Sequence, residues 1–210
     1  MEILVVIAVV GVLTGITLVA LPRVRESANS AKCQGNLRQI VSSAMLYAND
    51  HGGNYLPPIA NPSSGYQQWM FNHDFMDLVG YTTNGTDTST LPDYFRCPTA
   101  QSQGSTLNIN YGCNITGIGI SASNYKTAGY TPRLKLLASP AQLIYFMDAL
   151  DWWVQFSKAD QYVGTEAPMT QVAAYRHHGG ANVAFFDGHV AWMPRAELIR
   201  SVNRWNVYSN

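Results

Sequence analysis

The most informative pattern in the chain is an unbroken apolar stretch at its start. After Glu2, the nineteen residues from 3 to 21 carry no charge and are mostly apolar, and charges return directly after Pro22. A helix of this length rises about 28 Å, close to the ~30 Å hydrocarbon core of a bilayer. A cleaved signal peptide would need a basic start, a short apolar core and a small-residue cleavage site, which are not arranged here. The stretch therefore predicts a membrane-spanning helix over about residues 3–21.

Hydrophobic positions continue at helical spacing beyond this segment. Apolar or small residues recur every three or four positions from Val24 to Ala48, with charged and amide side chains between them. Gly52 and Gly53 then supply a stop signal. The pattern predicts one N-terminal helix over residues 1–50, hydrophobic first and amphipathic afterwards, which needs something outside its own domain to pack on.

Four residues of this predicted helix stand out. Pro22 removes one intrahelical hydrogen bond and should kink the helix or melt it locally. Gly11 and Gly15 lie four residues apart on one face, where a second helix could approach closely. Glu2 either pairs with a cation from a partner or complements the helix dipole within the headgroup region.

Shorter patterns after residue 50 predict an α+β head with an antiparallel β-sheet over residues 51–210. The segment 66–81 is typical of a short apolar-faced helix or two packed turns, and residues 107–111 alternate as a half-buried strand does. The apolar run 143–147 predicts a central strand. Residues 182–186 and 189–193 flank Asp187-Gly188, which predicts a two-residue hairpin turn.

Composition excludes one class of partner. The chain has 13 basic and 13 acidic residues and a formal net charge of zero, without a basic cluster, so nucleic-acid binding by charge is not expected. Charged residues make up 12% of the chain, about half the usual share. The surface should therefore consist largely of small polar residues and tyrosine, which suits self-association.

The three cysteines leave two interpretations open. In an exported domain, Cys97 and Cys113 could form a disulfide worth about 3 kcal/mol, leaving Cys33 over on the helix. Alternatively, all three are buried free thiols. Asn84 and Asn114 begin glycosylation-type sequons, which can also arise by accident in a chain so rich in Asn and Thr.

A segment rich in His and Asp near the C-terminal end contains the candidates for metal or catalytic chemistry, namely His177, His178, Asp187 and His189. Five strand residues would hold His177 and Asp187 roughly 16 Å or more apart, so these two should not share one ion. In the simpler interpretation, Asp187 and Gly188 make the turn and His177 anchors the loop before the hairpin.

Asp187 could still meet Asp148 or Asp151 from another loop and form a calcium-type oxygen cluster. We otherwise expect no cofactor and no metal. The chain lacks a glycine-rich phosphate loop, a serine elbow and a His-Glu-x-x-His helix, and we expect that it is not an enzyme.

The N-terminal pattern resembles a known family. A carboxylate, an apolar run, Leu21-Pro22 and an amphipathic extension are similar to the N-terminal helix of type IV pilins and of the pseudopilins of type II secretion. Further landmarks resemble the bacterial pilin-like group with a C-terminal H-X9-DG motif: residues 31–40, residues 49–58, Cys97-Pro98, residues 111–114, and His177 followed after nine residues by Asp187-Gly188.

The resemblance implies a structural subunit that sits in the inner membrane before assembly. It would be processed by a prepilin peptidase and polymerised by pilus or secretion machinery into a helical filament of identical subunits at the cell surface. In that family the glutamate meets the N-terminal amine of a neighbouring subunit, which implies the same role for Glu2. Members usually carry a methylated aromatic residue before the glutamate, whereas only Met1 precedes Glu2 here, so we expect the leader and the true mature N-terminus to be missing from this sequence.

Three other functions remain open at this stage. The nearest is a pseudopilin that builds a short periplasmic piston for secretion. A second is a membrane-anchored binding domain whose exposed aromatic residues form a carbohydrate or peptide platform; the candidates are Trp69, Tyr125, Trp152, Trp153 and Tyr162. A metal hydrolase has the least support.

Overall fold

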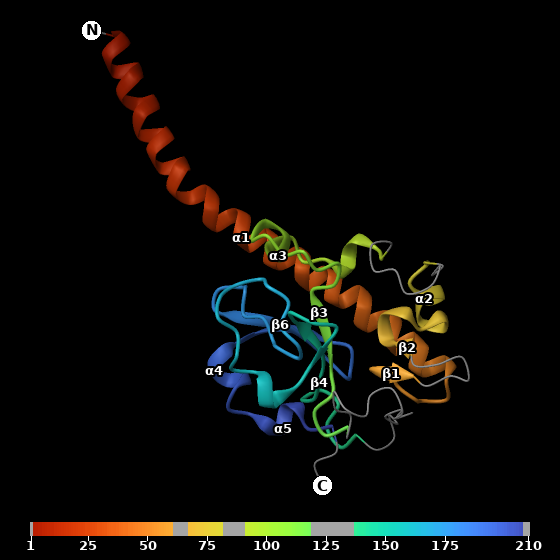
Figure 1. Ribbon diagram of the computed structural model, residues 1–210. Coiled ribbons are helices and arrows are strands. Elements are labelled where there is room, and N and C mark those ends of the chain that lie inside the picture. The colour runs from red at the N-terminus through yellow and green to blue at the C-terminus, as the bar shows by residue number, and fades with distance from the viewer. Residues whose placement is uncertain (1, 61–66, 82–90, 119–136, 208–210) are drawn as a thin grey trace.

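The computed structural model describes residues 2–60, 67–81, 91–118 and 137–207. A long N-terminal helix is followed by a head that combines helices with a five-stranded sheet and a small antiparallel pair of strands, so the fold is α+β as predicted (Figure 1). The N-terminal half of the helix projects away from the head (Figure 1). The elements are α1 (Glu2–Asp50), β1 (Ile59–Ala60), β2 (Gln67–Gln68), η1 (Trp69–Phe71), α2 (His73–Leu78), η3 (Asp93–Phe95), α3 (Pro98–Ser102), β3 (Tyr111–Asn114), β4 (Ile144–Asp148), β5 (Trp153–Val154), η5 (Phe156–Lys158), β6 (Gly180–Phe185), β7 (Val190–Pro194), α4 (Arg195–Leu198) and α5 (Val202–Trp205).

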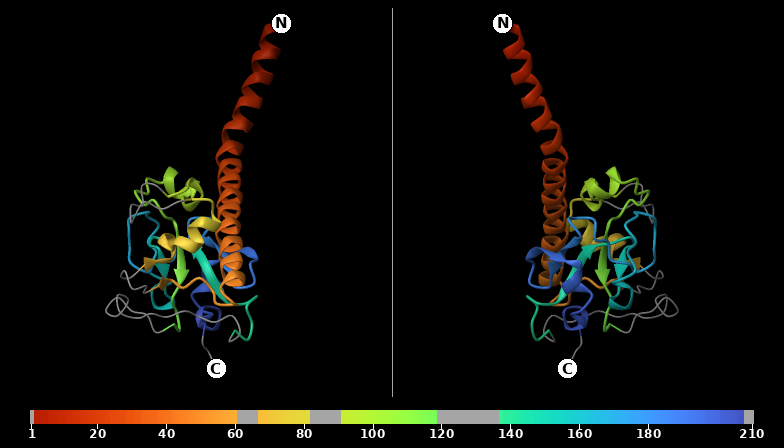
Figure 2. Two further views of the ribbon diagram at one scale, coloured as in Figure 1. Left: turned by 90° about the vertical axis from the view of Figure 1, so that its right-hand side faces the viewer. Right: turned by 90° about the vertical axis from the view of Figure 1, so that its left-hand side faces the viewer.

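Helix α1 is continuous from Glu2 to Asp50 and runs through Pro22 without interruption. Local melting at Pro22 therefore does not occur, although the helix bends along its length, and its projecting half leans away from the axis of the half beside the head (Figure 2). The helix ends as the sequence predicts. The Gly53 N–H donates to the Ala48 carbonyl at 2.8 Å, and Gly52 has φ 64°, the geometry of a Schellman C-cap.

The amphipathic half of α1 belongs to the core of the head. Its buried apolar positions begin at Cys33 and continue at helical spacing through Leu37, Ile40, Val41, Ala44, Tyr47 and Ala48. Val24 and Ala31 also fit the predicted stripe, but they are exposed because the helix meets the head only after them. The predicted boundary at residue 50 thus marks the end of the helix, whereas packing with the head begins some twenty residues earlier.

The main sheet has the strand order β5-β3-β4-β6-β7, with antiparallel pairs except for the parallel pair β3–β5. Strand β4 lies in the centre and all five of its residues are buried, which confirms the central strand predicted from the apolar run. One buried cluster joins α1 to this sheet, and a second joins the sheet to α4, α5 and the segment 149–175.

A bulge in β4 places two consecutive aromatic residues on the side of α1. Ile144 pairs with Phe185 and Phe146 pairs with Ala184, so Tyr145 is an extra residue on β4. Both Tyr145 and Phe146 therefore join the cluster that contains α1, and the Tyr145 hydroxyl donates to the Leu56 carbonyl at 3.0 Å. Bulges are known to redirect side chains in this way.

The C-terminal hairpin forms from β6 and β7 as predicted, but its turn is a different one. The Gly188 N–H donates to the Phe185 carbonyl, and the Phe185 N–H donates to the His189 carbonyl, both at 3.0 Å. Gly188 has φ 92°, whereas Asp187 is not among the residues with positive φ. The connection is thus a three-residue loop over 186–188 with glycine in the left-handed position, in place of the expected two-residue turn.

The weaker predictions for the head were partly right. Segment 66–81 does contain packed short turns of helix, η1 and α2, after the two residues of β2. The strand predicted at 107–111 begins only at Tyr111, and the segment 151–170, for which no element was predicted, contains the short elements β5 and η5.

Candidate functional site

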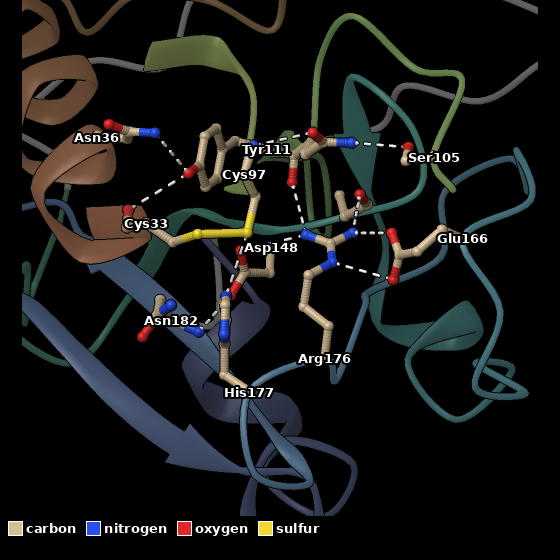
Figure 3. A network of polar contacts seen from close by, with 12 residues as sticks. Cys33, Asn36, Cys97, Ser105, Tyr111, Asp148, Glu166, Arg176, His177 and Asn182 are labelled. Carbon is tan, nitrogen blue, oxygen red and sulfur yellow. Dashed lines mark hydrogen bonds and ion pairs between the residues drawn. A yellow bond between two sulfur atoms is a disulfide. The ribbon is translucent and has the colours of Figure 1, made fainter. Parts of the chain in front are cut away.

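The sequence candidate His177 lies in a buried polar cluster, which we define as Asp148, Glu166, Arg176, His177 and Asn182 (Figure 3). Asp148 ends β4, Asn182 lies on the neighbouring β6, and Arg176 and His177 precede β6. Glu166 comes from the long connection after η5. All five side chains lie away from solvent, where a polar group without a partner is costly. The side-chain amide of Asn182 nevertheless has no hydrogen-bond partner within the described residues.

A tight turn directs His177 inward. His177 and Gly180 exchange backbone hydrogen bonds at 3.2 and 2.9 Å, and the two residues between them, His178 and Gly179, have φ 50° and 73°. Positive φ at both positions is typical of the type I′ turn. The Trp192 indole N–H closes the turn by donating to the His177 carbonyl at 2.7 Å, so the backbone of His177 is held in place before the hairpin.

The His177 ring faces a sulfur atom and a carboxylate. Its Nε2 lies 3.4 Å from Cys97 Sγ and 3.5 Å from Asp148 Oδ2, while Nδ1 has no hydrogen-bond partner within the described part of the chain. Burial lowers the pKa of His177, and this outweighs the opposing influence of Asp148. The imidazole is therefore neutral around pH 7.

Arg176 is the charged centre of the cluster. Its Nε and Nη2 donate to the two Glu166 oxygens at 3.1 and 2.8 Å, and Nη1 lies 3.3 Å from Asp148 Oδ1. Further bonds reach the carbonyls of Asn110 and Ala149. Burial opposes the charged form, but Asp148 and Glu166 outweigh it and raise the pKa of Arg176 above its ordinary value.

Asp148 is oriented from two sides. Its Oδ2 accepts the Asn182 backbone N–H at 2.7 Å, and Oδ1 faces Arg176. Burial raises the pKa of Asp148, while His177 and Arg176 act in the opposite direction. Two carboxyl groups, those of Asp148 and Glu166, therefore face the single guanidinium of Arg176.

A disulfide adjoins the cluster and joins α1 to the head. It links Cys33 of α1 to Cys97, the residue before α3, with a Cα–Cα distance of 5.3 Å (Figure 3). The predicted Cys97–Cys113 pair is therefore wrong, and so is the alternative of three free thiols. Cys33 is available because α1 packs on the head, whereas Cys113 is a free thiol buried in β3. Burial raises the pKa of the Cys113 thiol well above its ordinary value.

The second half of the H-X9-DG motif makes a separate local structure. Asp187 accepts the backbone N–H and the ring Nδ1 of His189 at 3.1 and 2.6 Å. Burial would raise the pKa of Asp187, but the contacts with His189 hold it below its ordinary value. Since His177 and Asp187 lie at opposite ends of β6, the motif does not form a single site, as the spacing predicted.

The calcium-type cluster does not form among these aspartates. Asp148 is engaged by Arg176 and Asn182, and Asp187 by His189. Asp151 accepts the Trp152 and Gln171 backbone N–H groups and the Trp153 indole N–H. The group with metal-ligand geometry within the described ranges is a different one, Cys33, Cys97 and His177.

Most of the proposed aromatic platform is core. Trp69, Trp153 and Tyr162 are buried, and the half-buried Trp152 stacks on Trp153 with ring centroids 4.3 Å apart. Tyr125 lies outside the described residues. Burial of these rings removes the main argument for a binding platform at these positions.

Asn114 is unsuited to glycosylation in the folded chain. Its side chain is fully buried, and its Nδ2 donates to the carbonyls of Ile144 and Trp205 at 2.9 and 2.7 Å. The sequon at Asn114 is therefore accidental. The other sequon, at Asn84, falls outside the described residues.

The N-terminal candidates lie on the projecting half of α1. Large apolar side chains from Ile3 to Val24 are 48–76% exposed, and the helix is long and apolar enough to cross a membrane. A methyl group added at Gly11 or Gly15 would meet nothing within 4 Å, so this small-residue face is open. Glu2 begins the helix, and its side chain lies outside the described set.

Sequence reasoning missed Glu166, Arg176 and Asn182. The sequence holds one signal, an arginine directly before the motif histidine in a chain with only 12% charged residues. Comparison with models of protein families, with curated proteins and with solved structures found no match.

Proposed function

We propose that this chain is a structural subunit that polymerises through α1 into a type IV pilus-like filament. The observation that carries the proposal is the contrast between the two halves of α1. The amphipathic half is fixed to the head by core packing and by the Cys33–Cys97 disulfide, while the apolar half is exposed along its length.

The exposed half needs an apolar partner. Burial of a large apolar side chain is favourable by about 1.5–3 kcal/mol, and thirteen of the described side chains from Ile3 to Val24 are large, apolar and exposed. A bilayer can cover them before assembly, and neighbouring copies of α1 can cover them in a filament core. Contacts between identical subunits that do not close into a ring extend into an open fibre.

Two further features support assembly over simple anchoring. A membrane anchor needs only the apolar segment, whereas this helix also presents an open small-residue face at Gly11 and Gly15, which suits close helix–helix contact. The sequence also has a carboxylate, Glu2, directly before the apolar run, as type IV pilins do. Pairing of this charge with a neighbouring subunit would fix how far adjacent copies of α1 are shifted along the fibre.

The test is to shear the surface of cells that make the protein and to examine the released material by electron microscopy and mass spectrometry. We expect long uniform fibres that contain this chain. Retention of the chain in the envelope without fibres would overturn the pilus proposal and favour a secretion pseudopilin or an anchored domain.

Glu2→Ala provides a residue-level test of the same proposal. We expect this substitution to reduce the fibre yield at least tenfold while the head stays folded, because the charge that pairs with the neighbouring subunit is lost. Glu26→Ala is the matched control, since it removes a partly exposed carboxylate from the same helix and should leave the yield nearly unchanged. Normal fibres from Glu2→Ala would contradict the charge-pairing role.

A further inference from the structure

Four buried donor atoms from separate segments converge beside the polar cluster. They are Cys33 Sγ on α1, Cys97 Sγ before α3, His177 Nε2 before β6 and Asp148 Oδ2 at the end of β4 (Figure 3). The two sulfurs and a ring nitrogen of His177 all lie within 4.8 Å of one another. All four residues are fully buried.

Two of the distances among these atoms match those between ligands of a tetrahedral zinc site. Bonds of about 2.0–2.3 Å from Zn²⁺ to nitrogen, oxygen and sulfur place neighbouring ligand atoms about 3.3–3.8 Å apart. His177 Nε2 already lies 3.4 Å from Cys97 Sγ and 3.5 Å from Asp148 Oδ2. On zinc binding the two sulfurs would separate from a covalent bond to roughly 3.7 Å. The Asp148 carboxylate, which lies outside the group of atoms within 4.8 Å of one another, would move toward them.

The surroundings suit Asp148 as a ligand. Arg176 and the Asn182 N–H hold the Asp148 carboxylate with Oδ2 toward His177, and such outer contacts orient ligands in metal sites.

Charge also favours a divalent cation when the cysteines are reduced. Two buried thiolates would add two negative charges to a cluster that already holds Asp148 and Glu166 against Arg176. One Zn²⁺ cancels both added charges, so the zinc dithiolate form has the same buried charge as the disulfide form.

We propose that the reduced chain binds one Zn²⁺ through Cys33, Cys97, His177 and Asp148. Binding replaces the two thiol protons by the metal ion and transfers no electrons. Zinc then connects α1 to the head at the same point as the disulfide does in the oxidised chain. This proposal concerns the single chain and does not depend on filament formation.

The experiment uses the full chain in detergent micelles, reduced with a phosphine and freed of metal. Zinc is measured by mass spectrometry after dialysis, and Co²⁺ serves as a spectroscopic probe. We expect about one Zn²⁺ per reduced chain, a thiolate-to-cobalt charge-transfer band, and the intense visible bands of a four-coordinate ion. The oxidised chain should bind neither metal at this site.

Variants separate this site from adventitious binding. His177→Gln and Cys33→Ser should each weaken zinc binding at least tenfold, with folding checked on the same samples by circular dichroism. Cys113→Ser is the matched control, because Cys113 is buried and free, and it should bind zinc as the parent chain does. A reduced parent chain without the charge-transfer band would overturn the proposal, as would equal losses in Cys113→Ser and Cys33→Ser.

Discussion

At the residue scale, the head is organised around a charged residue in its interior. The guanidinium of Arg176 donates five hydrogen bonds, to the carboxylates of Glu166 and Asp148 and to two backbone carbonyls. Such an arrangement is costly to disturb, since removing one partner leaves buried charges uncompensated. The His177 turn is built next to it, which explains why the motif histidine is buried although its neighbour His178 is exposed.

The first prediction concerns Arg176. We expect Arg176→Met to lower the free energy of unfolding by about 3–5 kcal/mol, because Asp148 and Glu166 lose their cation inside the protein. Chemical denaturation of the detergent-solubilised chain measures this loss. Arg204→Met is the control, since the Arg204–Glu197 pair is partly exposed and should contribute no more than about 1 kcal/mol. Equal losses of unfolding free energy in the two variants would contradict the stabilising role of Arg176 in the buried cluster.

The second prediction follows from buried tyrosines. Burial raises the pKa of Tyr111 and of Tyr145, so both stay neutral in the folded chain. In the unfolded chain they ionise near pH 10. Their contribution to stability is therefore complete below about pH 10 and is lost as the pH rises from there toward the folded-state values.

Unfolding free energies between pH 8 and pH 11 should show this alkaline loss, and tyrosinate absorbance should appear together with unfolding. Tyr145→Phe should reduce the dependence on pH, although it also removes the hydrogen bond to Leu56. Ionisation of all tyrosines near pH 10 in a chain that is still folded would contradict the prediction.

At the scale of single elements, the hairpin needs glycine at Gly188 for its backbone conformation, whereas α1 does not need glycine at Gly35. Gly188 adopts φ 92° in the hairpin loop, where an added methyl would meet only Met45 Cγ at an ordinary 3.5 Å. The cost of a larger residue at Gly188 therefore comes from the backbone. Gly35 lies inside α1, and an added methyl there would meet nothing within 4 Å.

The third prediction uses this contrast. Gly188→Ala should destabilise the chain by about 1–2 kcal/mol, because alanine disfavours the left-handed region. Gly35→Ala should stabilise it by about 0.5–1 kcal/mol through helix propensity. Thermal unfolding of the two variants beside the parent chain tests both signs, and a stabilised Gly188→Ala would exclude the three-residue loop.

At the scale of the whole molecule, the disulfide joins the element that projects from the head to the head itself. Cys33 and Cys97 are 64 residues apart in sequence, so the bond closes a long loop. The chain-entropy model gives about 4 kcal/mol for a loop of this size. The bond also lies close to the point where α1 leaves the head, since buried apolar positions on the helix begin at Cys33.

The fourth prediction is that Cys33→Ala lowers the unfolding free energy by about 4 kcal/mol in the presence of a chelator. The chelator prevents metal from binding to any parent chain whose disulfide becomes reduced during the measurement. Cys113→Ala, which deletes a buried thiol without breaking a bond, should cost only about 1–2 kcal/mol. Denaturation curves of the oxidised parent and the two variants give these unfolding free energies. Equal losses in Cys33→Ala and Cys113→Ala would contradict stabilisation by the disulfide.

The sequence alone determined the features that depend on local pattern. The apolar segment, the long helix with its glycine stop, the central strand at 144–148 and the strands of the C-terminal hairpin all follow from the periodicity of neighbouring residues and from glycine at positions of positive φ. The separation of His177 from Asp187 also followed, because strand geometry fixes the distance between the ends of β6.

Only the tertiary structure decided which distant segments meet. The Cys33–Cys97 pair, the contacts of Arg176 with Glu166 and Asp148, and the burial of Asn114 depend on how α1 and the connection after η5 pack on the sheet. The bulge at Tyr145 and the turn at His178-Gly179 also belong to the packed structure, since neither was predicted from the local sequence. Long-range contacts decide such features, because a polar group that leaves water is costly unless another part of the chain contributes a partner for it.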